Sequence, residues 1–548
     1  MQSNHIRNVL WAVAALTGAA PALGSVADHR EFDATLHAPY QGDKPDSDAR
    51  TFTLTFDYPF SQTALPVNWR VELLSPSGKA VQQWRGALTL KGQPATVNLK
   101  WEGRRHARGM PDGVYRVRLH AQAHGDVIEQ GWDIAVGRLA AAAMPPFRAM
   151  STGPASTAAR GPLPPSAAPA AASLPFTVYF ANLHSQTNHS DGGGDLGNCK
   201  GAQAPQAGAQ GPLEAYAYAH AHGLDVLMAS EHNHMYDGSD GSNPEASAGA
   251  ARALYQRGLK EAASFSKTNP GFLAMYGMEW GVINNGGHLN IFNAPELLGW
   301  ERDAKGEPIG DTITAKGDYR ALYSLMRERG WVGQFNHPAL GGQFLVDGVA
   351  MGYTKDGDEA MALCEVLNTS AFSTKTGEDE TRRSNYEIAC NKALEAGYHV
   401  AFSSNQDNHC ANWGASYTNR TGVLIPNGTA LTQASFIDAL KARRVFATMD
   451  KNSQLVLTAN GQPMGSRIAN SGPLRLIAHY ANTEGRSVAS VSIIEGVPGR
   501  NGTVSEAAAT AEATLTPSPG EHFYYARITQ DDGKILWSAP IWVTQVPD

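Results

Sequence analysis

Histidines and carboxylates recur directly after short apolar runs between residues 176 and 448, where together they could hold divalent metal ions. Five histidines and three carboxylates share this placement: His184, Asp191, His232, Glu279, His288, His337, Asp407 and His409. Imidazole and carboxylate groups suit zinc, iron or manganese. A single histidine after a strand is more often a hydrogen-bonded structural residue. Chance explains recurrence at so many strand ends poorly, so the pattern predicts a metal centre.

The elements that must position these residues alternate between strand-like and helical patterns. Apolar runs typical of strands cover 177–183, 226–230, 272–278, 288–293, 331–335, 362–367 and 399–404. Helical patterns cover 213–222, 319–329 and 382–396, and the residue directly after each range is a glycine. Repeated strand-then-helix order predicts an α/β fold with parallel strands and right-handed crossovers. An α/β barrel closes such a sheet at this length, and its catalytic groups collect at the C-terminal strand ends.

The ordered motifs of residues 176–448 resemble the PHP (polymerase and histidinol phosphatase) family. Residues 182–192 read N-L-H-S-Q-T-N-H-S-D-G, similar to the family's first motif D-L-H-x-H-T-x-x-S-D-G. A Glu-His pair at 231–232, a strand-end Glu, two isolated histidines and a closing D-x-H follow in the family's order. The first motif is also similar to an exported branch of the family that includes carbaryl-hydrolase-type enzymes.

This resemblance implies a distorted (β/α)7 TIM-like PHP barrel that binds about two or three divalent ions. Zinc is the expected metal, with manganese or iron as alternatives. The implied ligands are the eight residues named above, with Glu279 as the carboxylate that bridges metals. Glu279 and His189 are the expected catalytic residues. His189 could protonate a leaving group or ligate a metal, and it could equally be a loop side chain.

One position of the first motif departs from the family pattern. Gln186 stands where the second histidine of H-x-H is usual. A glutamine carbonyl oxygen is a weaker ligand than imidazole for zinc-like ions. The change puts one metal site or its affinity in doubt, although His184, Glu279 and Asp407 could still hold that ion.

The expected activity is metal-dependent hydrolysis of a small-molecule ester. Bound metal ions provide hydroxide at neutral pH and stabilise charge on the substrate oxygen. The family resemblance favours a phosphoester, and the exported branch leaves a carboxyl ester or carbamate open. No G-x-S-x-G motif marks a serine nucleophile. The alternative is a catalytically degenerate metal- or ligand-binding surface protein.

Residues 1–27 are expected to form a signal peptide. Arg7 is followed by an apolar stretch at 9–20 and by small residues that fit cleavage near Gly24 or Ala27. The alternative is an N-terminal membrane anchor. No other apolar run approaches the length of a spanning helix. We therefore expect a periplasmic or secreted protein with no stable membrane insertion after cleavage.

Two β-rich regions flank the central segment. Residues 28–137 are expected to form an immunoglobulin-like β-sandwich, because 99–103 and 110–117 resemble the W-x-G and L-P-D-G-x-Y ending of such modules. Residues 138–175, rich in Ala and Pro, are expected to be a linker, extended or disordered. Residues 449–548 are expected to form a second β-sandwich.

Net charge and cysteines restrict the partners and the compartment. The net charge is −7 and no basic patch is visible, so no nucleic-acid partner is expected. Four cysteines allow three pairings. Cys199 and Cys410 lie near the metal motifs, which favours their pairing over the alternative of four free thiols. The pattern does not indicate an oligomeric state.

Overall fold

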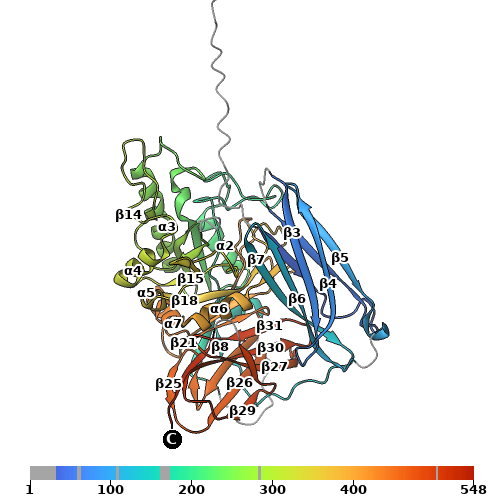
Figure 1. The fold of residues 1–548 in the computed structure, drawn as a ribbon. Helices are drawn as coiled ribbons and strands as arrows, with labels where there is room; N and C mark the ends of the chain where they lie inside the picture. The colour runs from blue at the N-terminus through green and yellow to red at the C-terminus, as the bar shows by residue number, and fades with distance from the viewer. Residues whose placement is uncertain are drawn as a thin grey trace, which may run out of the picture.

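The chain is a mixed α/β protein, rich in strands, with two β-sandwiches beside a large mixed sheet (Figure 1). The computed structural model describes residues 32–58, 63–106, 110–160, 173–281, 286–500 and 504–547. The predicted signal peptide lies outside the described residues. Within the described part of the chain, no helix combines the length and the hydropathy needed to cross a membrane.

The N-terminal β-sandwich packs two antiparallel sheets face to face. The first sheet has the order β1-β2-β5, and its strands are β1 (Asp33–His37), β2 (Arg50–Asp57) and β5 (Ala95–Trp101). The second has the order β4-β3-β6-β7, with β3 (Leu65–Leu74), β4 (Ala80–Leu90), β6 (Gly113–Ala123) and β7 (Asp126–Val136). A short 3-10 helix, η1 (Gly103–His106), follows β5. Apolar and polar residues alternate along β2, so one face of the first sheet fills the sandwich core.

The predicted linker carries more structure than its composition indicates. It contains the short strand β8 (Ser151–Thr152), which pairs in parallel with the central sheet, and α1 (Pro154–Arg160). The backbone N–H of Met150 donates to Gln454 Oε1, and the Met150 carbonyl accepts from Gln454 Nε2. The Met150 side chain is buried. Burial against the C-terminal region therefore orders a segment whose local sequence has weak preferences.

The central sheet combines parallel and antiparallel strands. Its strand order is β22-β21-β9-β10-β11-β12-β15-β18-β20. The bounds are β9 (Phe176–Asn182), β10 (Val226–His232), β11 (Leu273–Trp280), β12 (Leu289–Ile291), β15 (Gly333–Phe335), β18 (Met361–Thr369), β20 (Ala401–Asn405), β21 (Arg420–Pro426) and β22 (Val445–Thr448). The pairs β9–β10, β10–β11, β15–β18 and β18–β20 are parallel, as predicted.

The expectation of a parallel strand is wrong for β12, and the sequence patterns did not predict strand β21. Strand β12 runs antiparallel to both of its neighbours, and β21 runs antiparallel to β9 and β22. Only eight residues separate the end of β11 from the start of β12. A short connection of this kind returns the chain in the opposite direction, whereas parallel pairing requires a longer crossover.

Helices precede or connect most central strands. They are α2 (Pro212–Ala221), α3 (Ala248–Thr268), α4 (Tyr319–Arg329), α5 (Lys355–Ala360), α6 (Glu387–Ala396) and α7 (Gln433–Lys441), with the 3-10 helix η2 (Asn233–Asp237). The short strands β13 (Leu298–Gly299), β14 (Thr312–Ile313), β16 (Leu345–Val346) and β17 (Val349–Ala350) form two small ribbons.

The helix predicted over 382–396 begins later, at Glu387. Residues Arg383–Asn385 instead form β19, antiparallel to β18. The amide of Asn385 donates to the backbone carbonyl of Gly131 on β7, and the side chain of Gln130 accepts from the Asn385 backbone. Contacts with the N-terminal sandwich therefore override the local helical pattern.

The C-terminal β-sandwich is continuous with the central sheet. One of its sheets has the order β24-β23-β26-β29, with β23 (Ser453–Ala459), β24 (Gln462–Pro463), β26 (Leu474–Asn482) and β29 (Glu512–Leu515). The other contains β25 (Arg467–Asn470), β27 (Val488–Gly496), β28 (Ser505–Ala508), β30 (Gly520–Gln530), β31 (Ile535–Ser538) and β32 (Ile541–Gln545). Strand β31 pairs with β22, which joins the two regions through backbone hydrogen bonds.

A buried ion-pair network joins all three regions. Arg527 on β30 places Nη1 2.7 Å from Asp133 Oδ2 on β7 and Nε 3.0 Å from Glu387 Oε2 on α6. All three side chains are buried. Burial alone would raise the pKa of each carboxyl, but Arg527 and then Arg116 outweigh it and hold both pKa values below their usual range.

This network predicts a stability that declines in acid. Because the folded pKa values of Asp133 and Glu387 are lowered, their stabilisation is present above the unfolded pKa of about 4 and is lost as the pH falls through the folded values. We expect the urea midpoint to fall as the pH drops below about 5, with a smaller decline in Asp133→Asn. Equal pH dependence in the two proteins would contradict the assignment of this effect to the network.

Candidate metal centre

The strand ends of the central sheet bring the predicted ligands to one place. His184 follows β9, and His232 ends β10 directly beside Glu279 of β11 in the parallel register. His288 precedes β12, and His337 follows β15. Asp407 and His409 follow β20, where the bridge between Ser185 and Asn408 ties their loop to the first motif. The carboxyl ends of parallel strands share one edge of a sheet, which explains the convergence.

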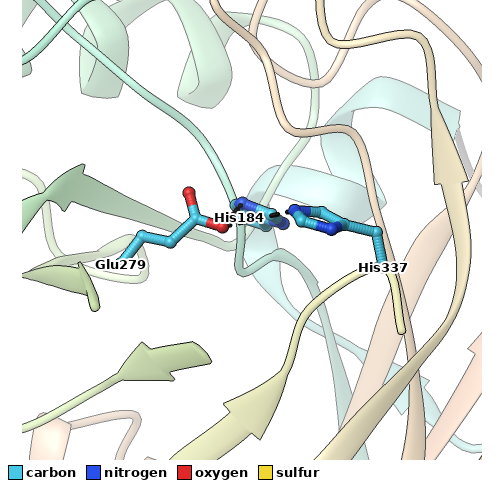
Figure 2. A group of neighbouring side chains, drawn as sticks. All are labelled: His184, Glu279 and His337. Atoms are coloured by element: carbon cyan, nitrogen blue, oxygen red, sulfur yellow. Dashed lines mark ion pairs between the residues drawn. The ribbon is translucent and has the colours of Figure 1, made fainter. Parts of the chain in front are cut away.

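Three overlapping groups of buried side chains could each hold a metal ion. The groups are His184/Glu279/His337, Asp191/His232/His409 and His232/Glu279/His288, with the ligand atoms of each within 4.8 Å of one another. Figure 2 shows the Glu279 carboxylate and the rings of His184 and His337 turned toward one another. Imidazole and carboxylate donors at this spacing fit zinc or manganese.

Glu279 belongs to two of these groups and connects them. Its Oε1 lies 3.0 Å from both His184 Nε2 and His288 Nδ1, and 3.4 Å from His337 Nε2. Its Oε2 lies 3.6 Å from His232 Nδ1. The carboxylate therefore lies between the imidazoles of both groups, where a bridging ligand would lie.

Asp407 and Asp191 complete the set on the opposite side. Asp407 Oδ1 lies 3.1 Å from His184 Nε2 and 3.7 Å from His409 Nδ1. Asp191 Oδ1 lies 3.4 Å from His409 Nε2 and 3.6 Å from His232 Nε2. The structure thus gathers all eight residues that the sequence singled out as ligands.

Buried carboxylates and imidazoles in the centre shift one another's pKa values. Burial alone lowers the pKa of His184, but the carboxylates of Asp407, Glu279 and Glu365 raise it well above its usual value. Burial raises the pKa of Glu279, but His184, His288 and His232 hold it well below its usual range. Carboxylates kept ionised among buried imidazoles are the electrostatic setting in which a divalent cation is stabilised.

Backbone strain coincides with two of the ligands. His337 has φ of 27° and Asp407 has φ of 48°, both in the left-handed region that residues with a side chain seldom adopt. Each such residue costs about 1–3 kcal/mol, and these conformations cluster at functional sites. At both positions the chain turns sharply after a strand and directs the side chain into the centre.

Glu365, on β18, is a further residue of the site. Its Oε1 lies 3.1 Å from His184 Nδ1, and its Oε2 accepts from the backbone N–H of His337 at 2.8 Å. Asn405 donates to Oε1 at 3.0 Å. A carboxylate on the ring nitrogen that faces away from the metal fixes the tautomer and the ring orientation of a ligand histidine. The signal in the sequence was a carboxylate inside the apolar run of β18.

We expect Glu365→Gln to weaken metal binding about 10–100-fold while leaving the fold intact. The amide keeps the shape of the side chain but removes the charge that holds the His184 tautomer. Competition with a chromogenic chelator measures the affinity, and exposed Glu359→Gln on α5 is the matched control. Unchanged affinity would show that Glu365 is not a positioning residue.

The Gln186 side chain contacts Glu279 directly. Its Nε2 donates to Glu279 Oε2 at 2.7 Å, and its Oε1 accepts from Ser190 at 3.1 Å. The Gln186 amide nitrogen therefore binds one oxygen of the Glu279 carboxylate, and the Gln186 amide oxygen faces the Ser190 hydroxyl. This contact gives the residue a role in orienting Glu279.

His189 lies outside the three groups, which does not favour its predicted catalytic role. Arg257 Nη2 lies 2.9 Å from His189 Nε2, and Tyr276 Oη lies 2.6 Å from Nδ1. Burial and then Arg257 lower its pKa to about 3, so the ring is neutral near pH 7. A neutral ring with both nitrogens engaged is poorly suited to give a proton to a leaving group.

Two disulfides brace the loops around the centre. Cys199 is bonded to Cys410, as the sequence favoured, and Cys364 is bonded to Cys390. The first bond fixes the loop after Asp191 to the residue after His409, and Gly194 forms a backbone bridge with Cys410. The second bond joins β18, at the residue before Glu365, to α6.

A cavity of about 290 Å³ opens onto the centre. His232, Glu279, His288, His337 and Asp407 line its inner end. Polar residues of β18 and of the loop after it line one side, among them Asn368, Thr369 and Ser370. A volume of this size suits a small molecule.

Comparisons with known proteins leave the family open. No family model matches the chain. An uncharacterized protein of Chlamydia muridarum is 29% identical over 128 residues, which is 20% of this chain and 20% of that protein. Among solved structures, the Bordetella pertussis protein ApaA is 16% identical, with a TM-score of 0.14, over 20% of this chain and 98% of its own. A β-glucuronidase of Bacteroides uniformis is 8% identical, with a TM-score of 0.16, over 94% of this chain and 61% of its own. Likenesses this weak carry no conclusion about fold or function.

Proposed function

We propose that this chain is a metal-dependent hydrolase of the PHP family that acts on a small-molecule ester. One observation carries the proposal: three overlapping groups of buried histidines and carboxylates converge at strand ends and face a cavity. The ordered motifs from His184 to His409 support the family. The metals would be two or three divalent ions, with zinc favoured and manganese or iron as alternatives.

The proposed architecture is a distorted (β/α)7 barrel flanked by two sandwiches. The strand order from β9 to β20 supports it, with helices between most of the strands. Strand β20 stands at one end of the strand order of the central sheet and packs against β21 and β22 at the other end. The ligands would then lie at the C-terminal mouth of the barrel, where such enzymes place their chemistry.

The side chains have separable tasks in this proposal. Divalent ions bound here would supply Lewis acidity and a water of lowered pKa near neutral pH. Glu279 and the surrounding imidazoles would hold those ions, and Glu365 would orient His184. The burial of these residues limits water around the site and strengthens its electrostatic interactions. Phosphoesters are the first substrate class to test, and carboxyl esters and carbamates are the second.

Export is part of the proposal. The two disulfides support an oxidising compartment, the periplasm or the exterior. A second function, metal or ligand binding without turnover, is favoured by the Gln186 contact with Glu279, because an amide stands where a ligand imidazole would be.

Turnover of chromogenic esters tests the proposal. Purified protein is assayed with 4-nitrophenyl phosphate, bis(4-nitrophenyl) phosphate, 4-nitrophenyl acetate and a 4-nitrophenyl carbamate, before and after chelation. We expect turnover of at least one ester class, lost to chelator, restored by zinc or manganese, and absent in His184→Ala. Exposed His222→Ala on the α2 terminus should retain it. Metal bound without turnover of any ester would favour the binding protein.

A further inference from the structure

The N-terminal β-sandwich forms one wall of the cavity that opens onto the metal centre. Its contribution comes from three strands and one loop: Phe32, Asp33, Thr35, Thr55, Asp57, Pro94, Asp126, Ile128 and Glu129 line the cavity. The sandwich is therefore part of the site.

The strand alternation of β1 and β2 explains how this wall arises. Ala34 and Phe56 point into the sandwich core and are fully buried. Their neighbours along each strand face the other way and line the cavity. These neighbours form two cross-strand pairs, Asp33 opposite Asp57 and Thr35 opposite Thr55. The outer face of this sheet, which would meet solvent in an isolated sandwich, thus meets the substrate space.

The wall is fixed to the central region by several contacts. The backbone N–H of Leu340, itself a cavity residue, donates to Val127 O on β7 at 3.2 Å. Asn385 bonds to Gln130 and Gly131, and the Asp133–Arg527 ion pair lies further along β7. The wall therefore keeps a fixed position relative to the metal ligands.

The wall is acidic, and two of its carboxylates lack a cationic partner. Glu129 is paired with Arg118 and His120. Neither Asp57 nor Asp126 has an ion-pair partner within the part of the chain that the structure describes. Burial raises the pKa of both, and the charge of His124 lowers that of Asp126 by less than burial raises it.

Basic groups on the cavity lining do not offset this charge. Arg382 is the one Arg or Lys among the described lining residues, and its guanidinium lies 3.4 Å from Glu380, outside the lining. A positively charged ligand group in the cavity would be attracted to the carboxylates of Asp57 and Asp126.

We propose that the N-terminal sandwich selects the substrate, and that Asp57 and Asp126 recognise a cationic group on the ester at a distance from the scissile bond. This inference rests on the proposed hydrolase function and adds a substrate class to it. The metal centre would hold the ester, and the acidic wall would hold a quaternary or protonated amine.

Two 4-nitrophenyl esters of identical shape test the inference, one ending in trimethylammonium and the other in tert-butyl. They are prepared in whichever ester class the protein turns over. We expect kcat/KM to favour the cationic ester by about tenfold, mainly through KM, and the preference to shrink with added salt. Asp57→Asn and Asp126→Asn should each reduce the preference roughly threefold.

Exposed Asp46→Asn, in the same sandwich and with the same charge change, is the matched control and should keep the preference. Thermal unfolding checks that each variant keeps its fold. Equal kcat/KM for both esters would overturn the inference, and so would a preference that persists when Asp57→Asn and Asp126→Asn are combined. Neither result would contradict the proposed hydrolase function.

Failure of the hydrolase itself gives a different result. Neither ester would then be turned over by metal-loaded protein, whatever its charge. Calorimetric titration with the corresponding ether pair, which cannot be hydrolysed, still measures the preference in that case. Tighter binding of the cationic ether, weakened in the double variant, would support the acidic wall, and equal binding would overturn it.

Discussion

Glu279→Gln is expected to lower the turnover of the reporter ester by a factor on the order of a thousand and to release at least one bound metal ion. The substitution keeps the shape of the side chain and removes the charge of the residue that connects two of the three groups. Its Oε1 lies within 3.4 Å of three imidazole nitrogens, so neutralising it also removes the electrostatic partner of His184, His288 and His337.

Metal content and kcat are measured on the same preparation of the Glu279→Gln variant. Exposed Glu245→Gln, which makes the same charge change before α3, should match the parent in both. Circular dichroism checks that the fold persists. A variant that retains full metal content and turnover would show that Glu279 is not a ligand, and the centre would have to be reassigned.

Arg527→Ala is expected to destabilise the protein by about 3–5 kcal/mol. The substitution leaves Asp133 and Glu387 as buried carboxylates without their nearest cation. Removal of one partner from a buried ion pair is costly, because the remaining charges keep their desolvation penalty. The N-terminal, central and C-terminal regions should all become easier to unfold, because each contributes one member of the network.

Urea unfolding followed by tryptophan fluorescence measures this loss. Arg475→Ala removes an exposed ion pair with Glu512 and is expected to cost at most about 1 kcal/mol. Arg527→Met combined with Asp133→Asn and Glu387→Gln should recover much of the stability, because no buried charge is then left uncompensated. A single variant as stable as the parent would show that this network does not join the regions energetically.

The convergence of the ligand motifs could be predicted from sequence because most of the ligands lie at or shortly after the end of an apolar strand. His184 follows β9, His232 ends β10 and Asp407 follows β20, so parallel pairing alone directs them to one edge. The geometry between them could not be predicted. That Gln186 would bond to Glu279, and that His189 would turn to Tyr276 and Arg257, depends on tertiary packing.

The errors in the predicted fold have the same origin. The helical pattern of 382–396 was read locally, whereas Asn385 is held by Gln130 and Gly131 of a distant strand. The residue pattern of β12 is the same for a parallel and an antiparallel strand. The sequence therefore could not show that β12 pairs in the antiparallel direction. The packing of the N-terminal sandwich against the cavity also left no local signal, because residues such as Asp57 look like ordinary exposed positions of a strand.

Metal analysis of purified mature protein by inductively coupled plasma mass spectrometry tests the central claim most directly. After loading with zinc or manganese and removal of excess, the account predicts about two or more ions per chain. It predicts a clear reduction in His184→Ala and no change in His222→Ala. One ion or none per loaded chain, with the same content in His184→Ala, would contradict a metal centre at these strand ends.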